Sequence, residues 1–96
     1  MTAVARIATG KEHRYVTWHC PGCEEGHGVP YHGASGPLWH WNGSLETPTI
    51  KPSVLVTSFK GEKSYRCHCF VEAGRIRFLS DCTHALAGQT VAMEPE

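Results

Sequence analysis

The feature that most restricts how this chain can fold is a cysteine pair, Cys20-Pro21-Gly22-Cys23, in a sequence of only 96 residues. A chain of this length buries only about two-thirds of its unfolded surface, so small domains often need a disulfide, a metal or a partner subunit as support. Two thiolates on either side of a tight turn can face one metal ion, and proline and glycine favour such a turn. The pair therefore predicts a metal knuckle that holds the fold together.

The composition favours a metal over a disulfide framework. Five cysteines cannot all pair, and the N-terminus lacks the apolar core of a signal peptide, so we expect a cytoplasmic protein with reduced thiols. Nine basic residues balance nine acidic ones, and no apolar stretch is long enough to span a membrane. A membrane protein and a dedicated nucleic-acid binder are both disfavoured, and Zn²⁺ is the expected metal.

Six prolines and ten glycines are spread along the chain and leave little room for a long helix. We therefore expect one domain over residues 1–96 that is all-β or rich in β-structure, with a zinc-ribbon-like knuckle and antiparallel hairpins. A short helical turn is expected over 83–87, ended by Gly88. Residues 1–12 are weakly patterned and predict a loose N-terminal arm.

The clearest element is a hairpin within residues 64–80, whose two strands flank Ala73-Gly74. A loop of three residues would turn Arg75 and Arg77 into the apolar face, so a loop of two or four residues is preferred. That register pairs Val71 with Ile76, Cys69 with Phe78, and Cys67 with Ser80.

Two further metal ligands must come from this hairpin or the segment after it. Cys67 lies on the apolar face in the preferred register, and Cys82 is its diagonal neighbour if the second strand continues. The predicted site is a closed one with four thiolates, Cys20, Cys23, Cys67 and Cys82. The rival ligands are His84, His68 and His27, although His68 should face away from Cys67 on a strand. Cys69 is expected to be a small core residue.

The histidines allow a second hypothesis, in which His27, His68 and His84 form an open site for a catalytic metal with Asp81 or Glu25 as base. The simpler interpretation is that these histidines bond backbone groups or lie at the surface, because a sequence cannot show that three side chains converge. Redox catalysis at the cysteine pair is disfavoured, since no helix is expected after it.

Several blocks of the sequence are familiar in their order and spacing. They are Cys20-Pro21-Gly22-Cys23, His27-Gly28, Trp41-Asn42-Gly43, Pro48-Thr49, Pro52-Ser53, Cys67-His68, Phe70-Val71 and the run DCTHALAGQTV over 81–91. Together they resemble a family of small Cys/His-rich proteins encoded by phages and prophages, over residues 18–91. The resemblance implies a phage origin and a site among Cys20, Cys23, His27, Cys67, His68, Cys82 and His84. It brings no established activity with it.

We therefore expect a zinc-binding phage accessory protein that acts as a protein-interaction module, with a mainly structural metal. Its partner would be a host or phage protein in the cytosol of the host cell. The neutral charge and the lack of an evident catalytic constellation favour this hypothesis over an enzyme. One alternative is a small metal-dependent hydrolase at the His-rich site. A second is a nucleic-acid-binding zinc-ribbon module that uses Arg66, Arg75 and Arg77.

Overall fold

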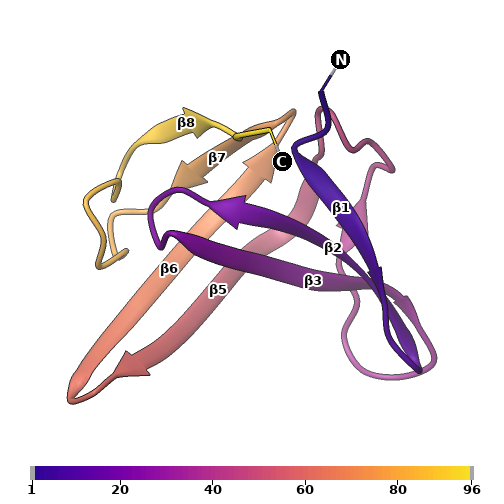
Figure 1. Ribbon diagram of the computed structural model, residues 1–96, viewed down its shortest axis with the longest axis horizontal. Helices are drawn as coiled ribbons and strands as arrows, with labels where there is room; N and C mark the ends of the chain where they lie inside the picture. Colours follow the sequence, from indigo (N-terminus) through magenta and orange to yellow (C-terminus); the bar gives the residue numbers. More distant parts are fainter. Residues whose placement is uncertain (1, 96) are drawn as a thin grey trace.

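Two antiparallel sheets make up the fold, in a computed structural model that describes residues 2–95. The first sheet contains strands β1 (Ala5–Thr9), β2 (His13–Cys20) and β3 (Glu25–Gly33). The second contains β4 (His40–Trp41), β5 (Ile50–Lys60), β6 (Lys63–Glu72), β7 (Arg75–Phe78) and β8 (Thr90–Ala92). Within each sheet the strands pair antiparallel in the order of the sequence (Figure 1), so the predicted all-β fold of antiparallel hairpins is confirmed.

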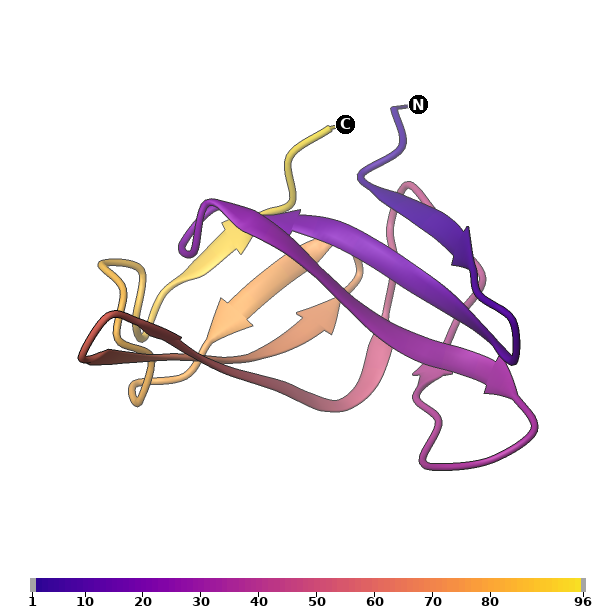
Figure 2. The same ribbon diagram turned by 60° about the horizontal axis from the view of Figure 1, so that its bottom comes forward.

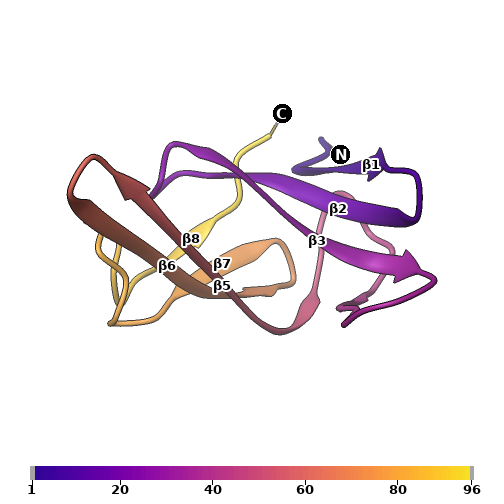
Figure 3. The same cartoon turned by 90° about the horizontal axis from the view of Figure 1, so that it is seen from below.

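The hydrophobic core lies between the two sheets, because β2 and β3 cross over one face of the larger sheet (Figures 2 and 3). Strands that alternate between core and solvent bury every second side chain. The buried residues of the smaller sheet include Val16, Trp18, Cys20 and Val29. Those of the larger sheet include Ile50, Val54, Cys67, Cys69, Val71, Ile76 and Phe78.

The predicted hairpin turn at Ala73-Gly74 is confirmed. Both residues have positive φ, 47° and 78°, as a two-residue turn between twisted strands requires. Val71 pairs with Ile76 and Cys69 with Phe78, as expected. Strand β7 ends at Phe78, however, and the chain then leaves the ladder, so the predicted pairing of Cys67 with Ser80 is not formed.

The N-terminal segment differs from the predicted loose arm over 1–12, of which residue 1 lies outside the described residues. Ala5–Thr9 forms strand β1 along β2, and the N–H groups of Val4 and Ala5 both donate to the Leu45 carbonyl, at 2.8 and 3.2 Å. Only Ala5 is buried within this edge strand, so the segment has no alternating pattern that a reading of the sequence could detect.

The segment between β7 and β8 runs through turns rather than a helix. The N–H of Ala87 donates to the carbonyl of His84 at 3.2 Å, which makes one hydrogen-bonded turn where a short helical turn was predicted. Gly88 follows with a φ of 77°, a conformation that suits glycine. In the part of the chain that the structure describes, no helix could cross a membrane.

Candidate metal centre and active site

The cysteine knuckle forms the tip of the β2–β3 hairpin. Cys20 is the last residue of β2, and its carbonyl accepts a hydrogen bond from the N–H of Glu24 at 2.8 Å. The N–H of Cys23 lies 3.4 Å from Cys20 Sγ and donates to it. This tight turn places both sulfurs on the side that faces the larger sheet.

Cys67 of β6 and His84 of the β7–β8 segment complete a group of four donors with Cys20 and Cys23. The ligand atoms of these residues all lie within 4.8 Å of one another. The Sγ atoms of Cys20 and Cys67 are 3.8 Å apart. Two sulfurs bound tetrahedrally to Zn²⁺ at 2.3 Å would also be about 3.8 Å apart. Three thiols and one imidazole are therefore spaced to hold a tetrahedral metal ion.

His84 packs tightly against the knuckle. A Cβ atom on Gly22 would collide with the imidazole ring, and Phe78 meets the ring edge-on with centroids 4.5 Å apart. The Nε2 atom is buried and has no hydrogen-bond partner among the described residues, a vacancy that a metal would satisfy. Burial also lowers the pKa of His84, which favours the neutral ring that binds metals. The Leu86 N–H lies 3.2 Å from Nδ1, and this contact must relax if a metal takes Nε2 and the ring proton moves to Nδ1.

The surroundings of these thiols disfavour their deprotonation in the absence of a cation. The hydrogen bond to Cys67, together with burial, raises the pKa of Cys20 to about 12. Burial, together with the nearby Cys20, raises the pKa of Cys23 to about 11. Metals bind thiolates, so a divalent ion entering this group would displace protons and neutralise the crowded negative charge. The donor set thus fits a metal such as Zn²⁺, which prefers sulfur and nitrogen ligands.

The structure brings three of the four predicted cysteines together with the rival ligand His84. Cys82 lies elsewhere, because its Sγ is 3.2 Å from both the backbone nitrogen and the backbone oxygen of His68. His27 is 6% exposed and meets Trp18 edge-on at 6.3 Å. The three histidines proposed for an open metal site therefore occupy three separate places. Among the described residues, the group that could hold a metal contains His84 but neither His27 nor His68.

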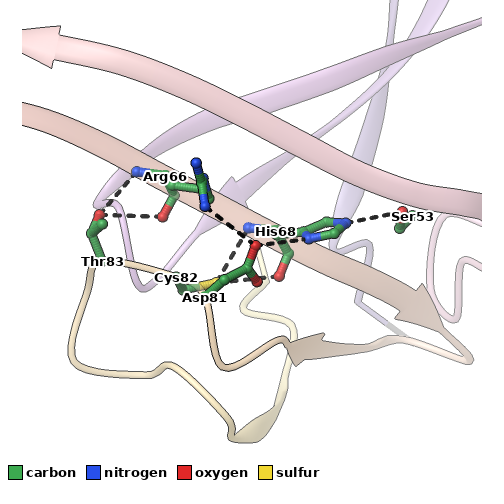
Figure 4. A network of polar contacts seen from close by, with 6 residues as sticks. All are labelled: Ser53, Arg66, His68, Asp81, Cys82 and Thr83. Carbon is green, nitrogen blue, oxygen red and sulfur yellow. Dashed lines mark hydrogen bonds and ion pairs between the residues drawn. The ribbon is translucent and has the colours of Figure 1, made fainter.

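A second cluster of polar side chains lies on the opposite, outer face of the larger sheet (Figure 4). His68 points there because it follows the inward-facing Cys67 on a strand. Its Nε2 atom is 3.2 Å from Ser53 Oγ, and its Nδ1 atom is 3.2 Å from Asp81 Oδ2. The hydroxyl, the imidazole and the carboxylate form one hydrogen-bonded chain. Its order is that of nucleophile, general base and orienting acid in a Ser-His-Asp triad.

An irregularity in β5 positions Ser53. Ile50 pairs with Val71 and Val54 with Cys69, so four steps along β5 match two along β6. Such bulges redirect side chains and are common beside active sites. The segment contains the cis peptide bond between Lys51 and Pro52.

Trp39 holds the irregular segment from the side of β4. Its indole Nε1–H donates to the Ser53 carbonyl at 3.3 Å. The backbone of Ser53 is therefore tied to a neighbouring segment while its hydroxyl points at His68.

One arginine borders the outer-face cluster. The Arg66 guanidinium lies 3.8 Å from the same Asp81 oxygen that contacts His68 (Figure 4). Arg77 pairs with Glu72 at 3.4 Å and stacks on the Phe70 ring at 4.5 Å. Two of the three arginines considered for nucleic-acid binding thus have carboxylate partners within the protein. Binding to nucleic acid stays a prediction.

The Ser53 site was not anticipated as a triad. The sequence suggests His68 as a metal ligand and Asp81 as the base of a metal-dependent hydrolase, and it assigns Ser53 no functional role. Each of three quoted blocks contains one member of the cluster, namely Pro52-Ser53, Cys67-His68 and the run over 81–91. These blocks were the available signal for a site. Whether Ser53, His68 and Asp81 meet, however, depends on the β5–β6 register and on the course of the chain after β7.

The outer face of the larger sheet thus carries a hydrogen-bonded Ser-His-Asp chain, the arrangement that serine hydrolases use. The chain belongs to the family of bacterial ubiquitination-like system serine proteases (BubE), whose family model matches residues 2–79. The matched range contains Ser53 and His68 and ends two residues before Asp81. No curated protein and no solved structure matches the chain. The family is a bacterial one, and a phage origin stays a prediction.

Proposed function

We propose that the protein is a serine protease that acts within a bacterial ubiquitination-like system, with Ser53 as nucleophile, His68 as general base and Asp81 as orienting acid. The observation that carries the proposal is the pair of contacts made by His68, 3.2 Å to Ser53 Oγ and 3.2 Å to Asp81 Oδ2. The family to which the chain belongs is named for this activity.

The geometry supports acyl transfer in two steps. The Nδ1–H of His68 donates to Asp81, which leaves the Nε2 lone pair to accept the proton of the Ser53 hydroxyl. Ser53 Oγ attacks the scissile carbonyl, and His68 passes the proton to the leaving amine as the C–N bond breaks. Water then attacks the acyl-serine with His68 again as base, which releases the acid and restores the hydroxyl.

The surface around the triad suits a polypeptide rather than a small ester. One hollow of about 610 Å³ is lined by Pro52 and Phe70, and another of about 490 Å³ is lined by Thr57 and Arg66. Arg66 and Phe70 lie two residues before and two residues after His68 on β6, so the hollows flank the base on both sides. A protease needs contacts on both sides of the bond that it cleaves. We therefore propose a protein substrate that lies along the outer face of β6.

We further propose that the metal is Zn²⁺ and that its role is structural. Four protein donors, three of them sulfurs, fill a tetrahedral coordination shell and leave no position for substrate. The donors also lie on the core side of β6, away from the outer-face triad. These features favour a serine mechanism over the metal-dependent hydrolase considered from the sequence.

The proposal is tested with a fluorophosphonate probe, which reacts with activated serines, followed by mapping of the modified peptide by mass spectrometry. We expect labelling of Ser53 in the zinc-loaded protein and none in Ser53→Ala or His68→Gln. Ser35→Ala is the matched control, because Ser35 is exposed and lines neither of the two hollows beside His68. An absence of Ser53 labelling would exclude a serine mechanism. The favoured hypothesis would then be a protein-interaction module whose partner is a host or phage protein.

A further inference from the structure

The metal centre and the triad share two chain segments. In β6, Cys67 belongs to the metal group and the next residue, His68, to the triad. In the segment after β7, Asp81 belongs to the triad and His84, three residues later, to the metal group. Each segment therefore carries one residue of each site.

The segment 79–84, which we call the acid loop, is held along β6 by backbone and side-chain hydrogen bonds (Figure 4). The N–H of Leu79 donates to the His68 carbonyl at 2.9 Å, and the Cys82 thiol lies 3.2 Å from that carbonyl and from the His68 nitrogen. The N–H of Thr83 donates to the Arg66 carbonyl at 2.9 Å, and Thr83 Oγ1 accepts the Arg66 N–H at 2.9 Å. These bonds set the loop beside β6 and present the carboxylate to the imidazole.

Cys82 is buried, but the hydrogen bonds of the exposed Thr83 do not by themselves keep this part of the loop closed, because water competes for them. Thr83 is exposed, and the side chain of Asp81 is 42% exposed. The far end of the loop is anchored at His84, whose ring packs over the knuckle and joins the metal group. A metal at this group would tie the acid loop to β6 through Cys67 and to the smaller sheet through Cys20 and Cys23.

We infer that the metal centre positions the catalytic triad: a metal held by Cys20, Cys23, Cys67 and His84 fixes the acid loop and so holds Asp81 against His68, an inference that rests on the proposed serine mechanism. The metal does not touch substrate. Cys82 and Thr83 are positioning residues, which act by holding Asp81 and His68 in register. Zinc occupancy then controls the reactivity of Ser53 indirectly. It acts through the distance between Asp81 and His68, neither of which binds the metal.

The first experiment measures the rate of Ser53 labelling by the fluorophosphonate probe in the zinc-loaded protein, after chelation, and after zinc is added back. We expect the rate to fall by about 100-fold on chelation and to recover with zinc, since loss of the orienting acid impairs the base. Far-UV circular dichroism recorded on the same samples reports whether the sheets persist. His84→Ala should reproduce the loss in the presence of zinc, and His84→Cys, which offers a fourth thiolate, should restore labelling.

The second experiment leaves every ligand in place. Thr83→Val removes the Oγ1 bonds to Arg66, whereas Thr83→Ser keeps them. We expect Thr83→Val to slow the labelling of Ser53 by the fluorophosphonate probe by about 10-fold with unchanged zinc content, and Thr83→Ser to retain the wild-type labelling rate. Thr9→Val, at an exposed threonine of β1, is the matched control.

The outcomes separate this inference from the proposed function. If Ser53 is not labelled in the zinc-loaded protein, the proposed function fails and the inference fails with it. If Ser53 is labelled equally fast with and without zinc, the serine mechanism stands and the positioning role of the metal is wrong. If chelation unfolds the sheets, the threonine pair decides, and an unchanged rate of Ser53 labelling in Thr83→Val overturns the inference.

Discussion

The metal centre and the triad are made from adjacent residues but lie in opposite environments. Cys20 and Cys67 are 0% and 2% exposed between the sheets, whereas the side chains of His68 and Asp81 are 25% and 42% exposed on the outer face. The alternation of β6 produces this separation, since Cys67 points inward and His68 outward. A buried group of thiols can hold two sheets together, and an open hydroxyl can reach a polypeptide. One strand therefore carries the metal group on one face and the Ser-His-Asp chain on the other.

The largest expected effect is the loss of activity when the triad on the outer face is disrupted. Ser53→Ala removes the nucleophile and should lower kcat/KM for a cleaved peptide by at least about 10³-fold, as loss of a triad member does. The midpoint of thermal unfolding should stay within a few degrees of wild type, because the Ser53 hydroxyl lies outside the core. Ser35→Ala, at an exposed serine outside both hollows, should keep full activity. Equal activity of the two variants would contradict the assignment of Ser53.

The next largest effect is the loss of stability when the buried metal group is disrupted. Cys20→Ser removes a fully buried sulfur of the metal group and should abolish stoichiometric zinc binding. Structural zinc contributes on the order of 10 kcal/mol in small domains, comparable to a whole domain's stability, so the variant should unfold or lose its cooperative transition. Cys69→Ala is the control, because Cys69 is buried outside the metal group and should cost about 1 kcal/mol. Elemental analysis and thermal denaturation decide the outcome.

Proton release on zinc binding is a further test of the buried metal group. The pKa values of Cys20 and Cys23 are raised to about 12 and about 11, so these thiols are protonated at neutral pH and must lose protons to a metal. Zinc affinity should therefore increase with pH, by up to about tenfold per pH unit for each proton displaced. Titration with zinc in a weakly buffered solution with a pH indicator should show acid release. Affinity that does not vary between pH 6 and pH 8 would contradict a thiolate site.

A glycine tests the contact between knuckle and acid loop. Gly22→Ala would place a Cβ against the ring of His84, so we expect weaker zinc binding and a partial loss of Ser53 labelling. The expected loss in zinc affinity is about tenfold, because the ring can shift but no longer lies in place before the metal binds. Gly26→Ala is the control, since its Cβ would meet only the Trp18 carbonyl at an ordinary 3.8 Å. The same zinc affinity in both variants would show that His84 is not confined by the knuckle.

The smallest effect concerns the charge beside Asp81. Arg66 lies 3.8 Å from Asp81 Oδ2, and both side chains are about half exposed, at 53% and 42%. Such pairs contribute little, so Arg66→Gln should lower kcat by less than about threefold. Arg75→Gln, on the neighbouring strand β7, serves as the control for the loss of one positive charge. A loss as large as that of Ser53→Ala would mean that Arg66 binds substrate directly.

Much of the fold was predictable because its signals are local. Ala73-Gly74 specifies a two-residue turn, and the alternation on either side sets the register of the β6–β7 hairpin. Strand β1 was not predictable, since as an edge strand it buries only Ala5 and depends on a contact with Leu45 that is distant in sequence. The fourth donor of the metal group was ambiguous for a similar reason. The choice between Cys82 and His84 depends on where β7 ends, and the chain turns away after Phe78.

The amino-acid sequence by itself determined the elements that depend on neighbouring residues: the knuckle at Cys20 and Cys23, the antiparallel hairpins, and the opposite orientation of Cys67 and His68. Only the tertiary structure decided which donors meet, because His84 reaches the knuckle through a packing of one sheet over the other. It also decided that Ser53, His68 and Asp81 form one chain. Their contacts join residues 13 and 15 positions apart across an irregular strand and a loop, and no periodicity records such distances.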